Sequence, residues 1–258
     1  MPRLSRSLPV TALFACLLAA AGTADAAPIL LHQYRLNSSL ADDLGGESLT
    51  SHGGRSLYYG YSFGPNEGLS LANGGVSDDW SIAIDFLFHD PTHGGVGWSK
   101  ILDTQNLATD WGIYTGWDGE IEVYADPNHS GSPLTLPPMT LSTLVITRNS
   151  STSYVKAYLN GELQNSALDA DGGLVSSGPL HFFMDDLFTL DTLNEATSGY
   201  VNNIRIWDGV LSGQDIAQLE ELDPPQIPEP ATVLLVGSGL AAAGLRRLRA
   251  RGRSTPQS

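Results

Sequence analysis

Three carboxylates at even spacing, Glu120, Glu122 and Asp126, are the residues of this sequence whose types and spacing could do chemistry. Residues separated by even steps on a β-strand lie on the same face of a sheet. Two carboxyl groups about 5 Å apart suit retaining hydrolysis of a glycosidic bond, with one acting as nucleophile and the other as acid. The alternative is an edge strand that turns Ile121 and Val123 to the core and leaves the carboxylates in water.

Aromatic side chains gather in the same part of the chain, among glycine and aspartate residues. An exposed ring can stack on one side of a pyranose while neighbouring carboxylates and amides hydrogen-bond its hydroxyl groups. We expect Trp80 and Trp207 to be buried in the core, and one tryptophan of the cluster to face solvent. The cluster consists of Trp98, Trp111, Tyr114, Trp117 and Tyr124, and its first four members are the candidates for carbohydrate binding.

A pair of adjacent aspartates, Asp185 and Asp186, follows the apolar run 181–184 and is the candidate for a metal site. A hard cation such as calcium prefers such carboxylates together with loop carbonyls, and Asp191, Asn194 and Glu195 lie close in the sequence. The alternative is that these are solvated loop carboxylates, because adjacent residues on a strand point to opposite faces. Calcium is the one cofactor that the sequence suggests.

Charge is distributed unevenly along the 258 residues, whose formal net charge is −15. Residues 27–228 contain six Lys or Arg and twenty-six Asp or Glu, whereas five arginines gather in residues 246–253. Such an acidic surface repels phosphate backbones and anionic lipids, so we predict no nucleic-acid partner. It either attracts divalent cations or serves only to keep the protein soluble.

Both ends of the chain are predicted to be processing segments. Residues 1–26 have the pattern of a secretory signal peptide: Arg3 and Arg6, an apolar run over 13–21, and small residues that predict cleavage after Ala26. The single cysteine, Cys16, lies in this segment. The mature chain therefore has no disulfide and must be stabilised by an apolar core.

The C-terminal part divides into three segments. A proline-rich linker over 223–230 precedes a hydrophobic segment over 231–245, which is shorter than the roughly 20 residues that span a bilayer. The basic residues 246–258 would hold that end in the cytoplasm. We predict a transient membrane anchor, and a permanent single-pass anchor is the alternative.

Between these ends, short alternating segments are separated by glycine, asparagine, aspartate, serine and proline, which predicts an all-β fold. Absence of crossover helices favours an antiparallel two-sheet sandwich. Asn160-Gly161 predicts a hairpin turn, and residues 212–222 predict one short closing helix that begins with a capping box. The predicted strands are 30–36, 57–63, 80–88, 119–124, 141–148, 154–159, 180–184 and 200–207, of which 80–88 alternates most clearly and should bury one face.

The tail resembles a known sorting signal. The order of Pro228-Glu229-Pro230, a short hydrophobic segment and an arginine-rich end is similar to the PEP-CTERM signal of Gram-negative bacteria. The resemblance implies an exosortase-type processing enzyme as partner and cleavage near this motif. It also implies release or attachment outside the cell, after passage through the inner membrane.

Residues 27–222 resemble the concanavalin A-like lectin/glucanase superfamily in its laminin G-like form. The segments with this likeness are 31–36 with 40–43, 80–88, 154–161, and 199–207 leading to 210–212. The resemblance implies a β jelly roll, but members of the superfamily range from lectins to glycosidases to adhesive modules, so the fold alone assigns no function. Asn202 and Asn203 stand where an acidic residue is frequent in the family, which weakens a metal site at those positions.

Laminarinase-type glucanases of this superfamily place Glu, Asp and Glu on one strand, whereas here Glu122 is in the middle and Asp126 stands further on. Side chains that differ by one methylene disturb the carboxyl separation that hydrolysis needs. We therefore predict a non-enzymatic surface or extracellular-matrix protein with a carbohydrate-binding or adhesive domain, and exopolysaccharide as its ligand. A glycoside hydrolase that uses Glu120, Glu122 and Asp126 is the alternative.

Overall fold

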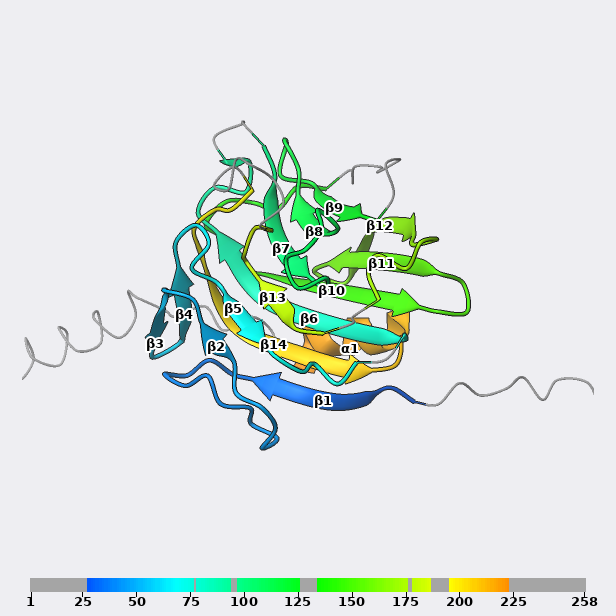
Figure 1. Cartoon of the computed structure of the whole chain (residues 1–258), viewed down its shortest axis with the longest axis horizontal. Helices are drawn as coiled ribbons and strands as arrows, with labels where there is room; N and C mark the ends of the chain where they lie inside the picture. Colours follow the sequence, from blue (N-terminus) through cyan, green and yellow to red (C-terminus); the bar gives the residue numbers. More distant parts are fainter. Residues whose placement is uncertain are drawn as a thin grey trace, which may run out of the picture.

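Two antiparallel β-sheets packed face to face make up the domain (Figure 1). The computed structural model describes residues 27–76, 78–93, 97–125, 134–175, 178–186 and 195–222. Every strand pairing within these residues is antiparallel. The predicted all-β jelly-roll sandwich with one short C-terminal helix is confirmed.

Sheet A is the larger of the two sheets, and β14 is its hub. The first half of β14 pairs with β4, the second half pairs with β1, and β6 runs along its other edge. In spatial order the sheet contains β12 (Glu162–Leu168), β11 (Tyr154–Leu159), β10 (Ser142–Asn149), β6 (Trp80–Phe88), β14 (Gly199–Asp208), β4 (Gly60–Phe63) and β3 (Arg55–Leu57), with β1 (Ile29–Tyr34) paired to β14 off this path.

Sheet B is built from shorter strands. In spatial order it contains β2 (Thr50–Ser51), β5 (Leu69–Leu71), β13 (Leu180–Phe182), β7 (Ser99–Asp103), β8 (Gly112–Thr115) and β9 (Ile121–Tyr124). The sequence did not predict β2, β5, β7 or β8. These strands have only two to five residues, which is too short for the alternation of apolar and polar residues to be distinguished from a loop.

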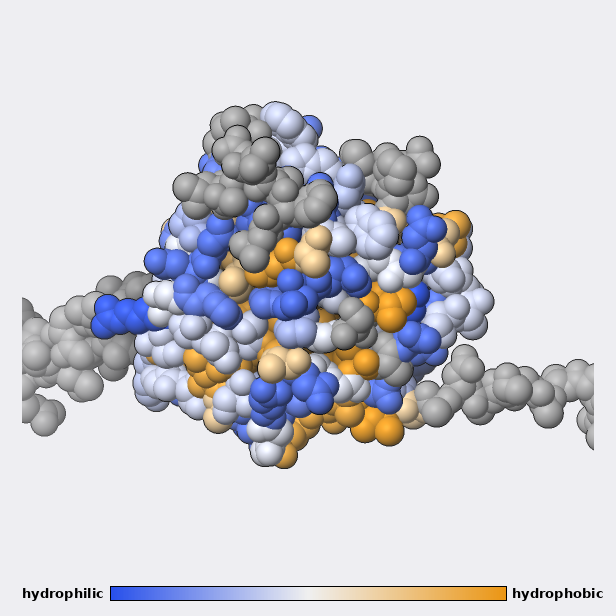
Figure 2. All heavy atoms as spheres, viewed as in Figure 1, coloured by the Kyte–Doolittle hydropathy of each residue, from blue (hydrophilic) through white to orange (hydrophobic). Residues whose placement is uncertain are grey.

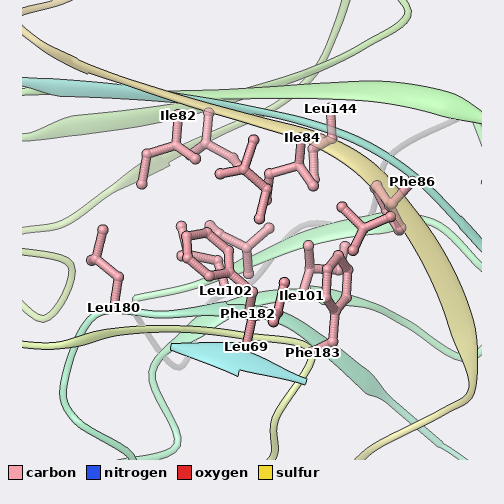
Figure 3. Packing of buried hydrophobic residues seen from close by; sticks show 14 of the residues in the cluster. Leu69, Ile82, Ile84, Phe86, Ile101, Leu102, Leu144, Leu180, Phe182 and Phe183 are labelled. Carbon is pink, nitrogen blue, oxygen red and sulfur yellow. The ribbon is translucent and has the colours of Figure 1, made fainter. Parts of the chain in front are cut away.

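The hydrophobic core lies between the two sheets (Figure 3). Ile82, Ile84 and Phe86 of β6 point from sheet A toward Leu102 and Phe182 of sheet B, and all five side chains are fully buried. Burying a side chain of this kind contributes about 1.5–3 kcal/mol. The predicted apolar face of residues 80–88 is therefore confirmed, as is the burial of both tryptophans, with Trp80 0% and Trp207 7% exposed.

The opposite face of sheet A is buried as well, which the sequence did not predict. Helix α1 (Gly213–Leu222) packs Ile216 against Ala83, Val145 and Trp207 in a second, smaller core. The central strands β6, β10 and β14 of sheet A are therefore covered on both faces, by sheet B on one and by α1 on the other. The outer face of sheet B, which points away from the main core, is not packed against α1, but its residues Lys100 and Asp103 are only 1% and 0% exposed.

Local signals explain the turn and the helix start. Asn160 and Gly161 both have positive φ, 49° and 79°, as the predicted two-residue hairpin between β11 and β12 requires. At the start of α1, the backbone N–H of Asp215 donates to Ser212 Oγ at 3.2 Å, and that of Ser212 donates to Asp215 Oδ2 at 2.9 Å. This reciprocal pair is the predicted capping box.

The predicted continuous strand over 57–63 is wrong. The chain turns at Tyr58 and Tyr59, which are 71% and 54% exposed, and forms the hairpin of β3 and β4. A Cβ at Gly60 would lie 2.5 Å from the carbonyl oxygen of Val201, so only glycine allows β4 to approach β14 this closely. The turn residues Tyr58 and Tyr59 are aromatic, as strand residues often are. Between Leu57 and Tyr61 they therefore predict a continuous strand.

Among the described residues, no helix is both long enough and apolar enough to cross a membrane. The predicted signal peptide 1–26 and the tail 223–258, with Pro228, Glu229 and Pro230, lie outside the described residues.

The second core makes a direct prediction about stability. Ile216→Ala should lower the free energy of unfolding by about 2–5 kcal/mol, because it leaves a cavity between α1 and sheet A. Gln218→Ala, an exposed position on the same helix, should change it by less than about 0.5 kcal/mol. Urea denaturation measures both, and equal effects of the two substitutions would show that α1 does not pack on the sheet.

Candidate functional site

A row of polar side chains crosses the outer face of sheet B. Directly paired residues of neighbouring strands share a face, and the register pairs Ser70 of β5 with His181 of β13, and His181 with Asp103 of β7. The next pairs are Lys100 with Tyr114 of β8, and Tyr114 with Glu122 of β9. The core face of the same strands carries the apolar residues Leu69, Phe182, Leu102, Ile113 and Val123.

A β-bulge in β7 brings Lys100 and Asp103 to the same face. Residues three apart on a regular strand point to opposite faces, but the register of β7 against β8 shifts between Lys100 and Leu102. A bulge adds one residue and reverses the alternation beyond it. Lys100 Nζ consequently lies 3.1 Å from Asp103 Oδ2.

The ammonium group of Lys100 is the centre of the site. It is fully buried and donates to Asp103 Oδ2 at 3.1 Å, to Asp186 Oδ2 at 3.0 Å and to the carbonyl oxygen of Thr109 at 3.3 Å. It also lies 5.1 Å from the centroid of the Tyr114 ring. Three acceptors use the three N–H groups of an ammonium.

Two further carboxyl groups, those of Asp110 and Glu195, converge with that of Asp186 beside this ammonium. Single carboxylate oxygens of Asp110, Asp186 and Glu195 all lie within 4.8 Å of one another, and we call these three residues the acidic cluster. They come from three separate segments: the loop between β7 and β8, the loop after β13 and the residues before β14. Carboxylate oxygens at this separation are a donor set for a hard divalent cation.

Backbone contacts hold each of these segments. The backbone N–H of Lys100 donates to the carbonyl oxygen of Glu195 at 2.8 Å. The hydroxyl of Tyr114 donates to the carbonyl oxygen of Asp110 at 2.7 Å. The N–H of Asp185 donates to Asn66 Oδ1 at 2.7 Å. These contacts hold the backbone of the segments, and hydrogen bonds of the Asp110 carboxyl group with Asp186 and Glu195 link the side chains to one another.

The predicted strand over 180–184 is too long. Phe183 has a left-handed φ of 60°, which ends β13 at Phe182. Its ring turns into the core and stacks on Phe63 with centroids 4.4 Å apart. Asp185 and Asp186 lie beyond this break, so the strand rule that would send them to opposite faces does not apply, and both are buried near Lys100.

Burial, together with the crowding of carboxyl groups, raises the pKa values of Asp110, Asp185 and Glu195. Burial, together with the charges of Asp110 and Asp185, raises the pKa of Glu195 from 4.5 to about 8. Burial and the charge of Asp186 raise the pKa of Asp185 from 3.8 to about 6. Burial and a hydrogen bond with Asp186 raise the pKa of Asp110. The site therefore retains protons near neutral pH unless a cation compensates its charge.

Aromatic rings border the acidic cluster. Trp98, Tyr114 and Tyr124 form what we call the aromatic triad, with ring centroids 5.7–6.3 Å apart and the rings nearly perpendicular. Burial and the charges of Asp110 and Glu195 raise the pKa of Tyr124. The triad and the acidic cluster therefore lie within electrostatic reach of each other on one face.

The predicted carbohydrate-binding residues fall into three environments. Trp98 and Tyr114 belong to the triad, where Trp98 is partly and Tyr114 almost fully buried. Trp111 packs against the backbone of Gly173: a Cβ atom added at Gly173 would lie only 2.1 Å from the indole ring. Trp117 is 55% exposed in the turn between β8 and β9. One tryptophan of the cluster thus faces solvent, as predicted.

The structure describes two of the three carboxylates of the predicted row, Glu120 and Glu122. Ile121 and Val123 are buried in the core, so Glu120 and Glu122 share the opposite face, as even spacing requires. Glu120 Oε2 accepts the backbone N–H of Asp118 at 2.8 Å, which ties it to the turn before β9. Asp126 lies outside the described residues.

Sequence reasoning missed three residues of the site: Lys100, Asp103 and Asp110. Lys100 is one of two lysines in the whole sequence, and a lone lysine beside aspartates in an acidic chain is a signal that could have been used. Asp110 offers no comparable signal, because its partners Asp186 and Glu195 are more than seventy residues away.

The fold and this face define an antiparallel jelly-roll domain of the kind found in lectins, with a polar, aromatic-lined outer sheet. Residues 73–217 match the concanavalin A-like lectin/glucanases superfamily, and the chain belongs to this superfamily. Residues 226–249 match the PEP-CTERM protein-sorting motif. This motif indicates export and surface sorting in Gram-negative bacteria, and implies processing by exosortase-type machinery.

No curated protein matches the chain. Among solved structures, it is similar to domain 4 of AbnA, a GH43 extracellular arabinanase from Geobacillus stearothermophilus in complex with arabinotriose, with a TM-score of 0.56 and 16% identity over 74% of this chain and 98% of that chain. It is also similar to Trypanosoma rangeli sialidase in complex with sialic acid, with a TM-score of 0.54 and 11% identity over 74% of this chain. The latter match covers 32% of the sialidase. At these identities the likeness shows the fold.

The raised pKa values predict how stability depends on pH. Without a bound cation, the unfolded chain releases protons from Glu195 and Asp185 at lower pH than the folded chain does. Stability should therefore fall as the pH rises from about 5 to about 8. Glu195→Gln should flatten this dependence, because the amide does not titrate. Urea midpoints in chelator at several pH values measure it, and identical pH profiles for both proteins would contradict the assignment.

Proposed function

We propose that this exported protein binds carbohydrate through the outer face of sheet B, as an adhesive protein of the cell surface or extracellular matrix. The observation that supports this most strongly is the placement of the aromatic triad beside the acidic cluster on that face. Rings supply stacking surface, and carboxylates accept hydrogen bonds from sugar hydroxyl groups. Figure 2 shows that the face turned to the viewer mixes hydrophilic and hydrophobic residues.

Trp98 and Tyr124, the partly exposed rings of the triad, are suited to serve as a stacking surface because they are held rigidly. Trp98 is supported edge-on by both Tyr114 and Tyr124, and Tyr114 is anchored by its hydroxyl group to the backbone of the loop before β8. Trp117 adds an exposed indole in the next turn of the same sheet. A rigid aromatic loses little conformational entropy when a ligand binds to it.

The charge of the face selects among polysaccharides. Asp103, Asp110, Asp186 and Glu195 surround a single lysine, Lys100. Anionic sugars would be repelled by this excess of carboxylates. The ligand we propose is therefore an uncharged exopolysaccharide, which an exported surface protein meets outside the cell.

Replacing the exposed indole tests carbohydrate binding without disturbing the core. Trp117→Ala should weaken binding to a neutral polysaccharide at least about tenfold, as expected for an aromatic anchor. Tyr154→Ala removes an aromatic residue that is 42% exposed on β11 of sheet A, and should leave binding unchanged. Glycan arrays followed by titration calorimetry on the purified exported protein provide the measurement. Equal losses in both variants, or no binding by the unaltered protein, would refute the proposal.

A glycoside hydrolase is the second candidate, and one observation favours it. Glu120 and Glu122 share the outer face of sheet B, and Glu122 is paired with Tyr114 of the aromatic triad. Release of reducing sugar from a neutral polysaccharide would reveal hydrolysis. Glu122→Gln should then lower the rate by about 10²–10⁴-fold, whereas Glu162→Gln, an exposed glutamate on β12, should not. If neither substitution lowered the rate of hydrolysis, this assignment would be wrong.

A further inference from the structure

We propose that the side chains of Lys100 and Asp186 become joined by an amide bond between Lys100 Nζ and Asp186 Cγ, so that the exported protein crosslinks itself. The bond would connect β7 to the segment after β13, two parts of the chain whose reacting residues are 86 positions apart. The proposal does not rest on carbohydrate binding. Its support comes from the contact of the two groups, from their burial and from the hydrogen bonds that distinguish Asp186 from the other carboxyl group in contact with the lysine.

The two reacting groups are in contact. Lys100 Nζ lies 3.0 Å from Asp186 Oδ2, and both side chains are completely buried. The lysine stem is confined, because its ammonium lies 5.1 Å from the centroid of the Tyr114 ring and a Cβ atom added at Gly112 would lie 3.1 Å from Lys100 Cε. A nucleophile and an electrophile held together in this way react as parts of one molecule and need no bimolecular encounter.

Burial favours the amide over the ion pair. A buried ammonium and a buried carboxylate lose their hydration, and their mutual attraction compensates this cost only when the geometry is excellent. An amide carries no net charge, so its formation removes the cost of keeping two ions away from water. The exclusion of solvent from both side chains also protects the product from hydrolysis.

Asp186 differs from Asp103, the other carboxyl group in contact with the ammonium. Asp103 Oδ1 accepts the backbone N–H groups of Gln105 and Leu107, both at 2.9 Å. These bonds stabilise the anionic form of Asp103, which resists attack by an amine. Asp186 instead shares a hydrogen bond with the carboxyl group of Asp110. Because an ionised carboxylate only accepts hydrogen bonds, this contact contains a proton, which makes Asp186 the better electrophile.

The reaction balances without another reactant. A proton moves from Lys100 Nζ to Asp186 Oδ2 along their contact, and the freed nitrogen lone pair attacks Asp186 Cγ to form the N–C bond. Asp110 donates its proton to the departing hydroxyl group, the bond between Cγ and that oxygen breaks, and water leaves. The nitrogen then returns a proton to Asp110. One ammonium and one carboxylate thus become one amide and one water, and nothing is oxidised or reduced.

Asp110 is held in position for this proton transfer. The Tyr114 hydroxyl donates to its carbonyl oxygen at 2.7 Å, and its carboxyl group also shares a hydrogen bond with Glu195. The carbonyl oxygen of Glu195 in turn accepts the backbone N–H of Lys100 at 2.8 Å. Asp110 therefore touches the reacting carboxyl group of Asp186 from a fixed place, which makes it the catalytic residue of the crosslinking reaction.

The alternative is a permanent buried ion pair, in which Lys100 only neutralises the carboxylates around it. Both arrangements use the same contacts, so the covalent state of the lysine distinguishes them. The chain suits such a test, because its whole sequence contains only two lysines, Lys100 and Lys156. Lys156 lies exposed on β11 and serves as an internal control.

The experiment is peptide mapping by mass spectrometry of the purified exported protein after denaturation. We expect trypsin to cut after Lys156 but not after Lys100, and an amine-reactive label to modify only Lys156. The peptides that contain Lys100 and Asp186 should appear as one branched species, lighter than their sum by the mass of one water. A Lys100 that is cut and labelled like Lys156 would overturn the proposal, and so would a branch at Asp103.

Asp110→Asn tests the catalytic role, because it leaves Lys100 and Asp186 in place and removes the proton donor. The linked fraction soon after synthesis should fall at least about tenfold. Asp171→Asn is the matched control at an exposed loop position and should be linked as fully as the unaltered protein. Equal linked fractions in these two variants would overturn the role of Asp110.

Lys100→Met removes the nucleophile, and its digest should contain no branched species. A branch that persists in this variant would overturn the assignment to Lys100. Mapping is done on denatured chains, so the result for the unaltered protein stands even if a variant does not fold. None of these results depends on whether the protein binds sugar.

Discussion

The buried ammonium of Lys100 is the interaction on which the arrangement of the outer face depends. It joins Asp103 at the end of its own strand, Asp186 beyond β13 and the backbone of Thr109 before β8. Its own backbone N–H holds Glu195 before β14. One residue thus positions four segments, and a single positive charge keeps several carboxylates in a place where they would otherwise repel one another. The chemistry that we assign to this face follows from the remaining excess of negative charge.

The fold explains why this chemistry is on sheet B. Sheet A is the broader sheet, and its central strands are covered on both faces, by the main core on one and by α1 through Ile216 and Trp207 on the other. Some of its buried polar groups pair with one another: Asp85 accepts hydrogen bonds from Thr143 at 2.7 Å and Asn203 at 3.0 Å. Sheet A is therefore a scaffold. Sheet B has shorter strands and a polar outer row, and it contacts the core with one face only.

The match to the sorting motif indicates where the two sheets have their different roles. The motif indicates a protein that is exported and sorted to the surface, and its single cysteine lies at Cys16, ahead of the domain. No disulfide can then hold the loops that frame the outer face. The amide bond that we propose between Lys100 and Asp186 would supply a covalent crosslink at this face that cysteine chemistry does not provide here.

Much of the scaffold could be predicted from the sequence, because it depends on local patterns. The alternation of residues 80–88, the Asn160-Gly161 turn and the capping box at Ser212 are each set by neighbours in the chain. The site could be predicted only in part. Adjacent aspartates pointed to Asp185 and Asp186, and Glu195 was close enough in sequence to be considered with them.

The rest depends on features that no local pattern reveals. A bulge in β7 turns Lys100 and Asp103 to one face, and the left-handed backbone of Phe183 ends β13 early. Asp110 is distant from Asp186 and Glu195 in the sequence, and only the folded sheet brings them together. The short strands of sheet B and the turn at Tyr58 were missed because brief apolar segments do not distinguish a strand from a loop.

A crystal structure of the exported protein with a bound neutral oligosaccharide tests the central claim most directly. The account predicts Lys100 at the centre of the outer face of sheet B, in contact with Asp103 and joined to Asp186 by continuous electron density. It also predicts a sugar ring stacked on Trp98 and Tyr124. A Lys100 side chain that points into solvent, or sugar bound to another face of the domain, would contradict it.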